Sequence, residues 1–121
     1  MKIQLLHPFE LEVLDKIYTG EFRDITKKES KKINELLPSK ELKEVEKINR
    51  KSKRSIKDNA RLEELMVIIE GYDPESIYEA RLKLSVISDN KADILAVGSE
   101  YGYKRVFDTI TDDIAERRSG N

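Results

Sequence analysis

The sequence lacks cysteine and tryptophan, and its 121 residues include one histidine, five glycines and three prolines. Without cysteine the chain can build neither a disulfide framework nor a thiolate metal site, which fits a reducing compartment. It contains no apolar run near the roughly 20 residues of a membrane-spanning helix, and no charged, apolar and small-residue leader opens it. We therefore expect one small cytoplasmic domain with no membrane span and no secretion signal.

Charge is abundant but unevenly placed along the chain. Charged residues make up 39% of the sequence and hydrophobic residues 38%, with a net charge of −1. Residues 1–61 carry 16 basic and 11 acidic groups and residues 62–121 carry 7 basic and 13 acidic groups, so the halves have net charges of +5 and −6. Such a chain can fold its halves against each other, stack head to tail with copies of itself, or offer two surfaces to two partners. The sequence leaves these three arrangements open.

The scarcity of glycine and proline predicts helices joined by short turns. We expect an all-α fold: an irregular bundle of about five helices with one long central helix and a short extended N-terminal segment, Met1–Leu6. Within a single domain, residues 1–38 would form an N-terminal helical hairpin, 39–71 a long basic helix and 72–121 an acidic helical subdomain.

The N-terminal third predicts two helices. The first is expected over Pro8–Thr19, because Phe9, Val13 and Ile17 recur at helical spacing among other apolar residues and Gly20 follows as a stop. The second is expected over residues 27–36. It starts with the capping-box spacing of Thr26 and Glu29 and ends before Pro38.

The longest helical stretch has no glycine or proline from Lys40 to Glu70, and Ser39 is its expected N-cap. A straight helix of that length would span about 46 Å, whereas a compact domain of this size has a radius of gyration of only about 14 Å. The helix must therefore project from the domain or break, and Ser55–Asn59 offers backbone-competing side chains where a break fits.

The C-terminal half predicts three further helices. Gly71 should end one helix and Asp73 and Pro74 begin the next, although residues 81–86 also alternate like a strand. Helices over 92–101 and 103–118 flank Gly102. We interpret this pair as a packed helical hairpin and not as a DNA-reading motif, because the second helix carries four acids where phosphates would lie: Asp108, Asp112, Asp113 and Glu116.

A run of basic residues without an intervening acid is the most conspicuous local feature. It comprises Lys47, Arg50, Lys51, Lys53, Arg54 and Lys57. Six positive charges of this kind can bind a phosphate backbone, but the run has no aromatic residue on which bases could stack. The cluster is therefore a candidate site for phosphates or for an acidic partner, and the competing interpretation is a solvated helix face.

Aromatic residues at turns are candidate protein contacts. Tyr72, Tyr101 and Tyr103 adjoin glycines, where a tyrosine ring can bury area while its hydroxyl stays in water, either at an interface or at an ordinary domain rim. Phe22 stands alone in a polar segment and is either a plug into the core or an exposed anchor.

No pattern in the chain indicates chemistry. The adjacent carboxylates of Glu63 and Glu64 point about 100° apart on a helix, and His7 has no partner at motif spacing and is assigned to helix entry. Phosphate-loop and dinucleotide-binding patterns are absent. We expect no catalytic residue, no cofactor, no metal and no small-molecule substrate, and hence not an enzyme.

These observations favour a non-enzymatic helical protein-binding module, such as a small adaptor, assembly factor or chaperone, that uses charged faces and turn tyrosines on a protein partner or on copies of itself. The alternative is a nucleic-acid-associated regulator that places residues 47–57 against phosphates. A weaker alternative is an inhibitor whose acidic residues 108–116 mimic an acidic ligand of a basic target.

Overall fold

The computed structural model describes residues 5–119 and is an α+β protein, so the all-α prediction is wrong. A three-stranded antiparallel sheet has the order β1-β2-β3. The strands are β1 (Leu6–Val13), β2 (Lys16–Arg23) and β3 (Val86–Ile87). The helices of the described part are α1 (Lys27–Asn34), α2 (Ser39–Asn49), α3 (Ile56–Glu70), α4 (Glu75–Ser85), α5 (Lys91–Tyr101) and α6 (Tyr103–Ser119).

The predicted helix over Pro8–Thr19 is a β-hairpin. Its apolar residues satisfy a helical spacing, but burial follows a period of two, with Phe9, Leu11 and Phe22 buried and the residues between them on β1 exposed. In this register Phe9 pairs with Gly20 and Leu11 with Tyr18, so both strands turn one apolar face to the helices. Of the expected extended segment, Leu6 lies in β1 and residues 1–4 lie outside the described residues.

Gly20 does not end a helix but lies within β2, where the backbone of the β3 segment comes close. A Cβ atom at this position would lie 2.7 Å from the carbonyl oxygen of Ile87 and 2.8 Å from Cβ of Ser88. The close packing between strands therefore requires glycine at this position. From the sequence alone, a glycine in this role cannot be distinguished from one that ends a helix.

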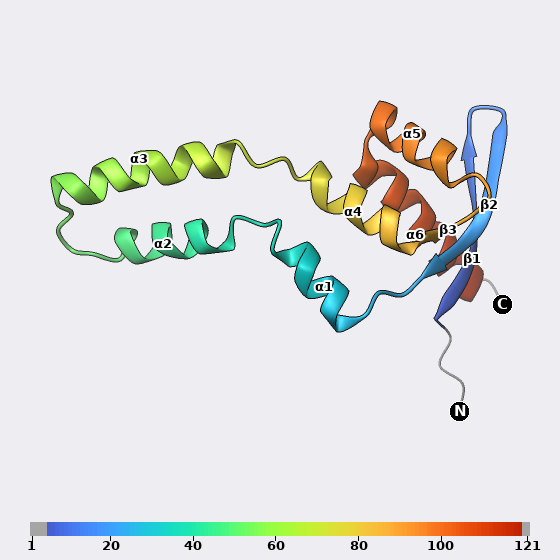
Figure 1. Ribbon diagram of the computed structural model, residues 1–121, viewed down its shortest axis with the longest axis horizontal. Coiled ribbons are helices and arrows are strands. Elements are labelled where there is room, and N and C mark those ends of the chain that lie inside the picture. Colours follow the sequence, from blue (N-terminus) through green and yellow to red (C-terminus); the bar gives the residue numbers. More distant parts are fainter. Residues whose placement is uncertain (1–4, 120–121) are drawn as a thin grey trace.

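The body of the protein consists of the sheet, of α6 and α4, which pack on β1 and β2, and of α5, which packs on α6 and α4 (Figure 1). Its core is formed by Phe9, Leu11, Phe22, Leu82, Val86, Ile94, Val106 and Ile110. Two predicted helix boundaries in residues 72–119 are confirmed: α4 follows Pro74, and Gly102, with a φ of 111°, separates α5 from α6. Of the alternating segment 81–86, only Val86 lies in a strand, and the residues before it belong to α4.

The α2–α3 hairpin, residues 39–70, forms an arm that projects away from the body along the long axis of the molecule (Figure 1). The long helix of the sequence breaks, but at residues 50–55, before most of the expected segment Ser55–Asn59. Ser55 caps α3 in a capping box with Asp58, so residues 56–59 form the first turn of the new helix. The capping box of Thr26 and Glu29 at α1 is also confirmed. Ser39 is not a cap: it is the first residue of α2, after Pro38.

The arm has a small core of its own. Ile48 of α2 and Leu65 of α3 are buried between the two helices, and Arg61 of α3 forms an ion pair with Glu44 of α2. A two-helix unit of this kind buries little apolar area, so its stability depends on very few side chains.

We therefore expect the Leu65→Ala substitution, which removes a fully buried side chain at a typical cost of about 2–5 kcal/mol, to unfold the arm while the body stays folded. All five tyrosines lie outside residues 39–70, so near-ultraviolet circular dichroism reports on the body alone. The variant should lose far-ultraviolet helix signal and gain tryptic cleavage within the arm, with an unchanged tyrosine signal. In contrast, Ile110→Ala in the body core should weaken both signals. Loss of the tyrosine signal in Leu65→Ala would show that arm and body are one cooperative unit.

Candidate functional site

The structure places the basic cluster at the tip of the arm, at and around the loop between α2 and α3 and not along one helix face. We call these residues the basic tip: Lys47, Arg50, Lys51, Lys53, Arg54 and Lys57, all of them exposed. Lys51 forms an ion pair of 2.9 Å with Asp58, and Arg54 donates to Asn49. Within residues 5–119 the other four cations have no ion pair, so most of the charge faces solvent.

At the start of α3, the side chains of Ser55 and Asp58 form hydrogen bonds with backbone amides of the first turn. Asp58 accepts from the Ser55 backbone amide at 3.0 Å and Ser55 Oγ accepts from the Asp58 amide at 3.1 Å. The hydrogen bonds from Lys51 and from the Ser55 amide lower the pKa of Asp58. A ligand at the tip would thus meet basic side chains rather than free helix amides, together with the apolar side chain of Ile56, which is 88% exposed.

Helix α3 is apolar on more than one side. Leu65 is buried, and Leu62 and Ile69, one turn away on either side, are partly buried. Three successive residues, Met66, Val67 and Ile68, are exposed, Val67 by 71%. Because successive helical residues point about 100° apart, these three cover an arc of about 200° around the helix. We call these three residues the α3 flank. Residues 65–69 are thus apolar all round the helix, and a helix segment of that kind is normally buried, so this flank is a candidate docking surface.

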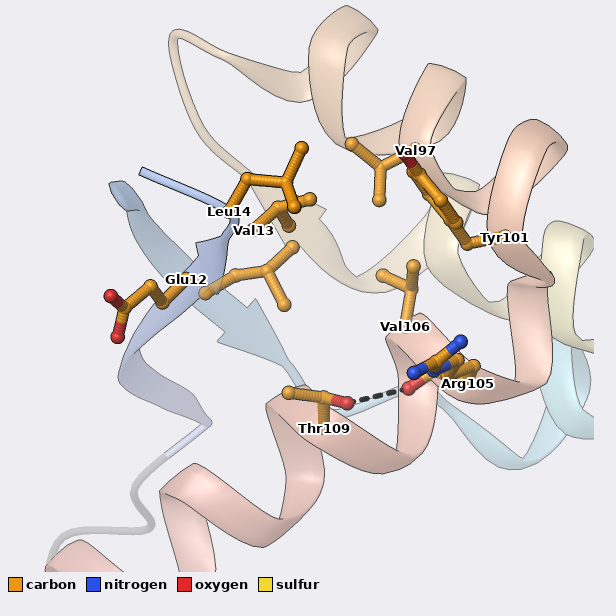
Figure 2. Close-up of a pocket in the computed structure, with 9 residues that line it drawn as sticks. Glu12, Val13, Leu14, Val97, Tyr101, Arg105, Val106 and Thr109 are labelled. Atoms are coloured by element: carbon orange, nitrogen blue, oxygen red, sulfur yellow. Dashed lines mark hydrogen bonds between the residues drawn. The ribbon is translucent and has the colours of Figure 1, made fainter. Parts of the chain in front are cut away.

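A second apolar surface lies at the turn of the β-hairpin. An open groove of about 280 Å³ runs between β1, α5 and α6. Figure 2 shows Val13 and Leu14 pointing toward Val97 and Tyr101 across this groove, with Arg105 and Thr109 of α6 along another side and the Glu12 carboxylate pointing away. Its lining fits an apolar side chain better than a polar metabolite.

Leu14 was not among the predicted residues, yet it is the most unusual one at this groove. Its φ of 56° lies in the left-handed region that favours glycine and asparagine, and its side chain is 82% exposed. A bulky apolar residue held in this conformation costs stability, and burial does not compensate for it. The sequence carried no signal for it, because the φ angle arises from the two-residue turn between strands that were predicted as helix.

Replacing Leu14 with asparagine should therefore stabilise the isolated protein by about 0.5–1 kcal/mol, since asparagine adopts positive φ more readily. Chemical denaturation with urea measures the change. Leu14→Ala, which shortens the side chain without relieving the backbone, is the matched control and should give no such gain. A lower stability of Leu14→Asn than of the wild type would show that the exposed leucine contributes to the fold.

Most of the predicted aromatic contacts have structural roles. Phe22 is a core residue: its ring lies 5.8 Å from that of Phe107, and the Arg81 guanidinium lies 5.7 Å from both ring centres. Tyr103 hydrogen-bonds to Glu79, which raises the pKa of the phenol, and its ring packs on Gly98. Tyr72 is partly buried near the start of α4, whereas Tyr101 is exposed at the groove. Only Tyr101 is placed as an interface residue would be.

Two of the four acids of α6 are engaged within the body. Asp108 forms an ion pair with Lys104, and Asp113 accepts hydrogen bonds of 2.9 Å from the Glu10 amide and from Arg117. Burial raises the pKa of Asp113, but the Glu10 amide and Arg117 outweigh it and lower the pKa overall. Asp113 thereby covers the outer edge of β1, so an acidic surface on α6 is reduced to Asp112 and Glu116.

His7 does not begin a helix. It lies buried on β1, with Nε2 3.0 Å from Asp24 Oδ1 and Nδ1 2.6 Å from Nη2 of Arg118, so it joins β1 to the end of α6. It is not among the residues that line the groove. Among residues 5–119 no group of histidine and carboxylate side chains is placed to hold a metal ion, and no helix is long and apolar enough to span a membrane.

An ion pair between Arg23 and Glu29 holds α1, the helix that precedes the arm, against the body. Arg23 of β2 donates to both carboxylate oxygens of Glu29, at 3.1 and 2.8 Å, and to the carbonyl oxygen of Leu84 at 3.1 Å. The hydrogen bond from Arg23, followed by the one from the Thr26 amide, lowers the pKa of Glu29 to about 2. This contact fixes where the arm leaves the body.

The lowered pKa of Glu29 gives a pH dependence with a definite sign. The folded pKa lies below the ordinary value, so the stabilisation is complete above about pH 4.5 and is lost as the pH falls toward 2. Thermal denaturation should show wild type more stable than Glu29→Gln at neutral pH, with the difference shrinking between about pH 5 and pH 2. Glu35→Gln, at an exposed glutamate just after α1, is the control. A difference between wild type and Glu29→Gln that is independent of pH would contradict the assignment.

Comparison of the chain with known family models, with curated proteins and with solved structures finds no match.

Proposed function

We propose that the chain is a non-enzymatic protein-binding module, an adaptor or assembly factor, that engages a protein partner in the cytoplasm with its projecting arm. The observation that carries this proposal is the α3 flank, three consecutive exposed apolar residues on an element that projects from the body (Figure 1). Exposed apolar residues gathered on one element mark interaction surfaces more often than scattered ones do.

The arm can bury only one side of α3 by itself. Helix α2 covers Leu65, and no other element of the described residues packs extensively on α3. A partner that covered Met66, Val67 and Ile68 would add the second packing surface that a two-helix unit lacks and would stabilise the arm on binding. The apolar character of the flank favours a protein partner with an apolar groove or helix.

The second candidate function is nucleic-acid association through the basic tip. Six exposed cations at the end of a projecting element would contact a phosphate backbone without steric hindrance from the body. The absence of an aromatic residue from positions 47–57 limits such binding to electrostatic, sequence-independent contact. We therefore rank it second.

The proposal is tested by placing a photo-crosslinking amino acid at Val67 of the full-length protein in the cell of origin. We expect one defined protein adduct from Val67, since this side chain is the most exposed of the flank. A crosslinker at Lys28, an exposed position on α1, is the matched control and should give none.

The double substitution Met66→Glu and Ile68→Glu, combined with the crosslinker at Val67, should abolish the adduct while circular dichroism shows a folded body and arm, because both side chains are exposed. Absence of any adduct at Val67, or an adduct that persists in the double variant, would refute docking through the α3 flank.

A further inference from the structure

The outer face of the β-hairpin is acidic and uncovered. On β1 the outward residues include Glu10 and Glu12, and on β2 they include Ile17, Thr19 and Glu21, all five of them exposed. Arg23 lies on the same face at the end of β2, where it is partly buried and paired with Glu29. Glu10 lies 3.6 Å from Arg117, whereas Glu12 and Glu21 have no ion pair within the described residues. We call these five residues the acidic face.

The acidic face and the basic tip lie at opposite ends of the molecule. The arm points away from the sheet along the long axis, while the helices of the body lie on the inner side of the hairpin (Figure 1). Within one chain the tip thus points away from the face. The basic tip and the acidic face both belong to residues 1–61, and the fold places them far apart, so that the molecule has a positive end and a negative end.

We propose that copies of this chain associate head to tail, with the basic tip of one copy docked on the acidic face of the next. The two surfaces are complementary in charge, and each also exposes one isoleucine among its charges: Ile56 on the tip, 88% exposed, and Ile17 on the face, 59% exposed. An apolar contact enclosed by a charged rim is the usual composition of a specific interface. The contact joins two different surfaces, so it repeats from copy to copy and builds rings or open filaments.

The second copy is a better occupant than a nucleic acid for two reasons on this chain. First, the tip exposes Ile56, and an isoleucine side chain makes no favourable contact with a phosphate. It also has no aromatic residue on which bases could stack. Second, the chain presents the complementary face itself. This inference rests on the proposed function in that the arm is again the docking element, but it uses the tip and not the α3 flank.

The test uses two variants of the protein, each with the charges of one surface reversed, alone and as a mixture. Light scattering after size-exclusion chromatography measures the mass of the particles that form. The tip variant carries Arg50→Glu, Lys53→Glu and Lys57→Glu, and the face variant carries Glu12→Lys and Glu21→Lys; all five positions are exposed and without ion pairs in the described part. We expect the wild type to associate at about 50 mM salt and to dissociate at about 500 mM, where screening is stronger. Each variant alone should associate at least about tenfold more weakly, which corresponds to about 1.4 kcal/mol.

A mixture of the two variants should restore association, because the basic tip of the face variant meets the acidic face of the tip variant and the reversed surfaces meet each other. The matched controls reverse the same number of charges elsewhere, with Lys28→Glu, Lys32→Glu and Lys40→Glu for the tip and Glu100→Lys and Glu116→Lys for the face. These controls should associate like the wild type.

Three results would overturn the inference: a wild type that stays monomeric at about 50 mM salt and about 100 µM protein, association that the tip variant retains, or a mixture that stays dissociated. A monomer that binds mixed DNA or RNA at low salt and loses this binding in the tip variant would assign the tip to nucleic acid instead. None of these results depends on the Val67 crosslink, so the head-to-tail contact and the docking of the α3 flank stand or fall separately.

Discussion

Two helices packed against each other can bury only the faces that they turn to one another, and this constraint governs the arm. Ile48 and Leu65 occupy that shared face, so the apolar residues of α3 beyond it are left exposed by the rest of residues 5–119. The basic tip at the end of the arm is exposed for the same reason, because the hairpin extends away from every other element (Figure 1). The arm thus carries apolar residues that the described part of the chain leaves exposed.

The body supplies a rigid support for this arm. Its core binds the inner face of the β-hairpin to α4, α5 and α6, and the contact of Arg23 with Glu29 and with the Leu84 carbonyl holds α1 against both the sheet and α4. The same packing leaves the outer face of the hairpin to solvent and gives the molecule its negative end. The alternation of side chains along the strands therefore both buries the inner face of the hairpin and exposes its outer face.

The sequence predicted the features that depend on neighbours along the chain and missed those that depend on distant ones. Local chemistry explains the capping side chains of Thr26 and Ser55 and the end of a helix at Gly102. The residues of the basic cluster are also neighbours along the chain. The β-hairpin was missed because Phe9, Val13 and Ile17 fit a helical spacing, although Ile17 lies on the outer face of the sheet and Phe9 and Val13 on the inner face. The packing of Gly20 against Ile87 and Ser88, which requires the strand, involves residues far along the chain. For the same reason the sequence did not decide whether Phe22 lies in the core or at an interface, and it did not predict the exposed turn position of Leu14.

Hydrogen exchange of the wild-type protein as a dilute monomer tests most directly whether the arm is a unit that a partner must complete. The account predicts that the amides of residues 39–70 exchange much faster than those of α4, α5 and α6 in the isolated chain, and that they gain protection when another molecule covers the arm. Protection of the arm equal to that of the body in the isolated monomer would contradict it, because a two-helix hairpin with that stability would need no partner.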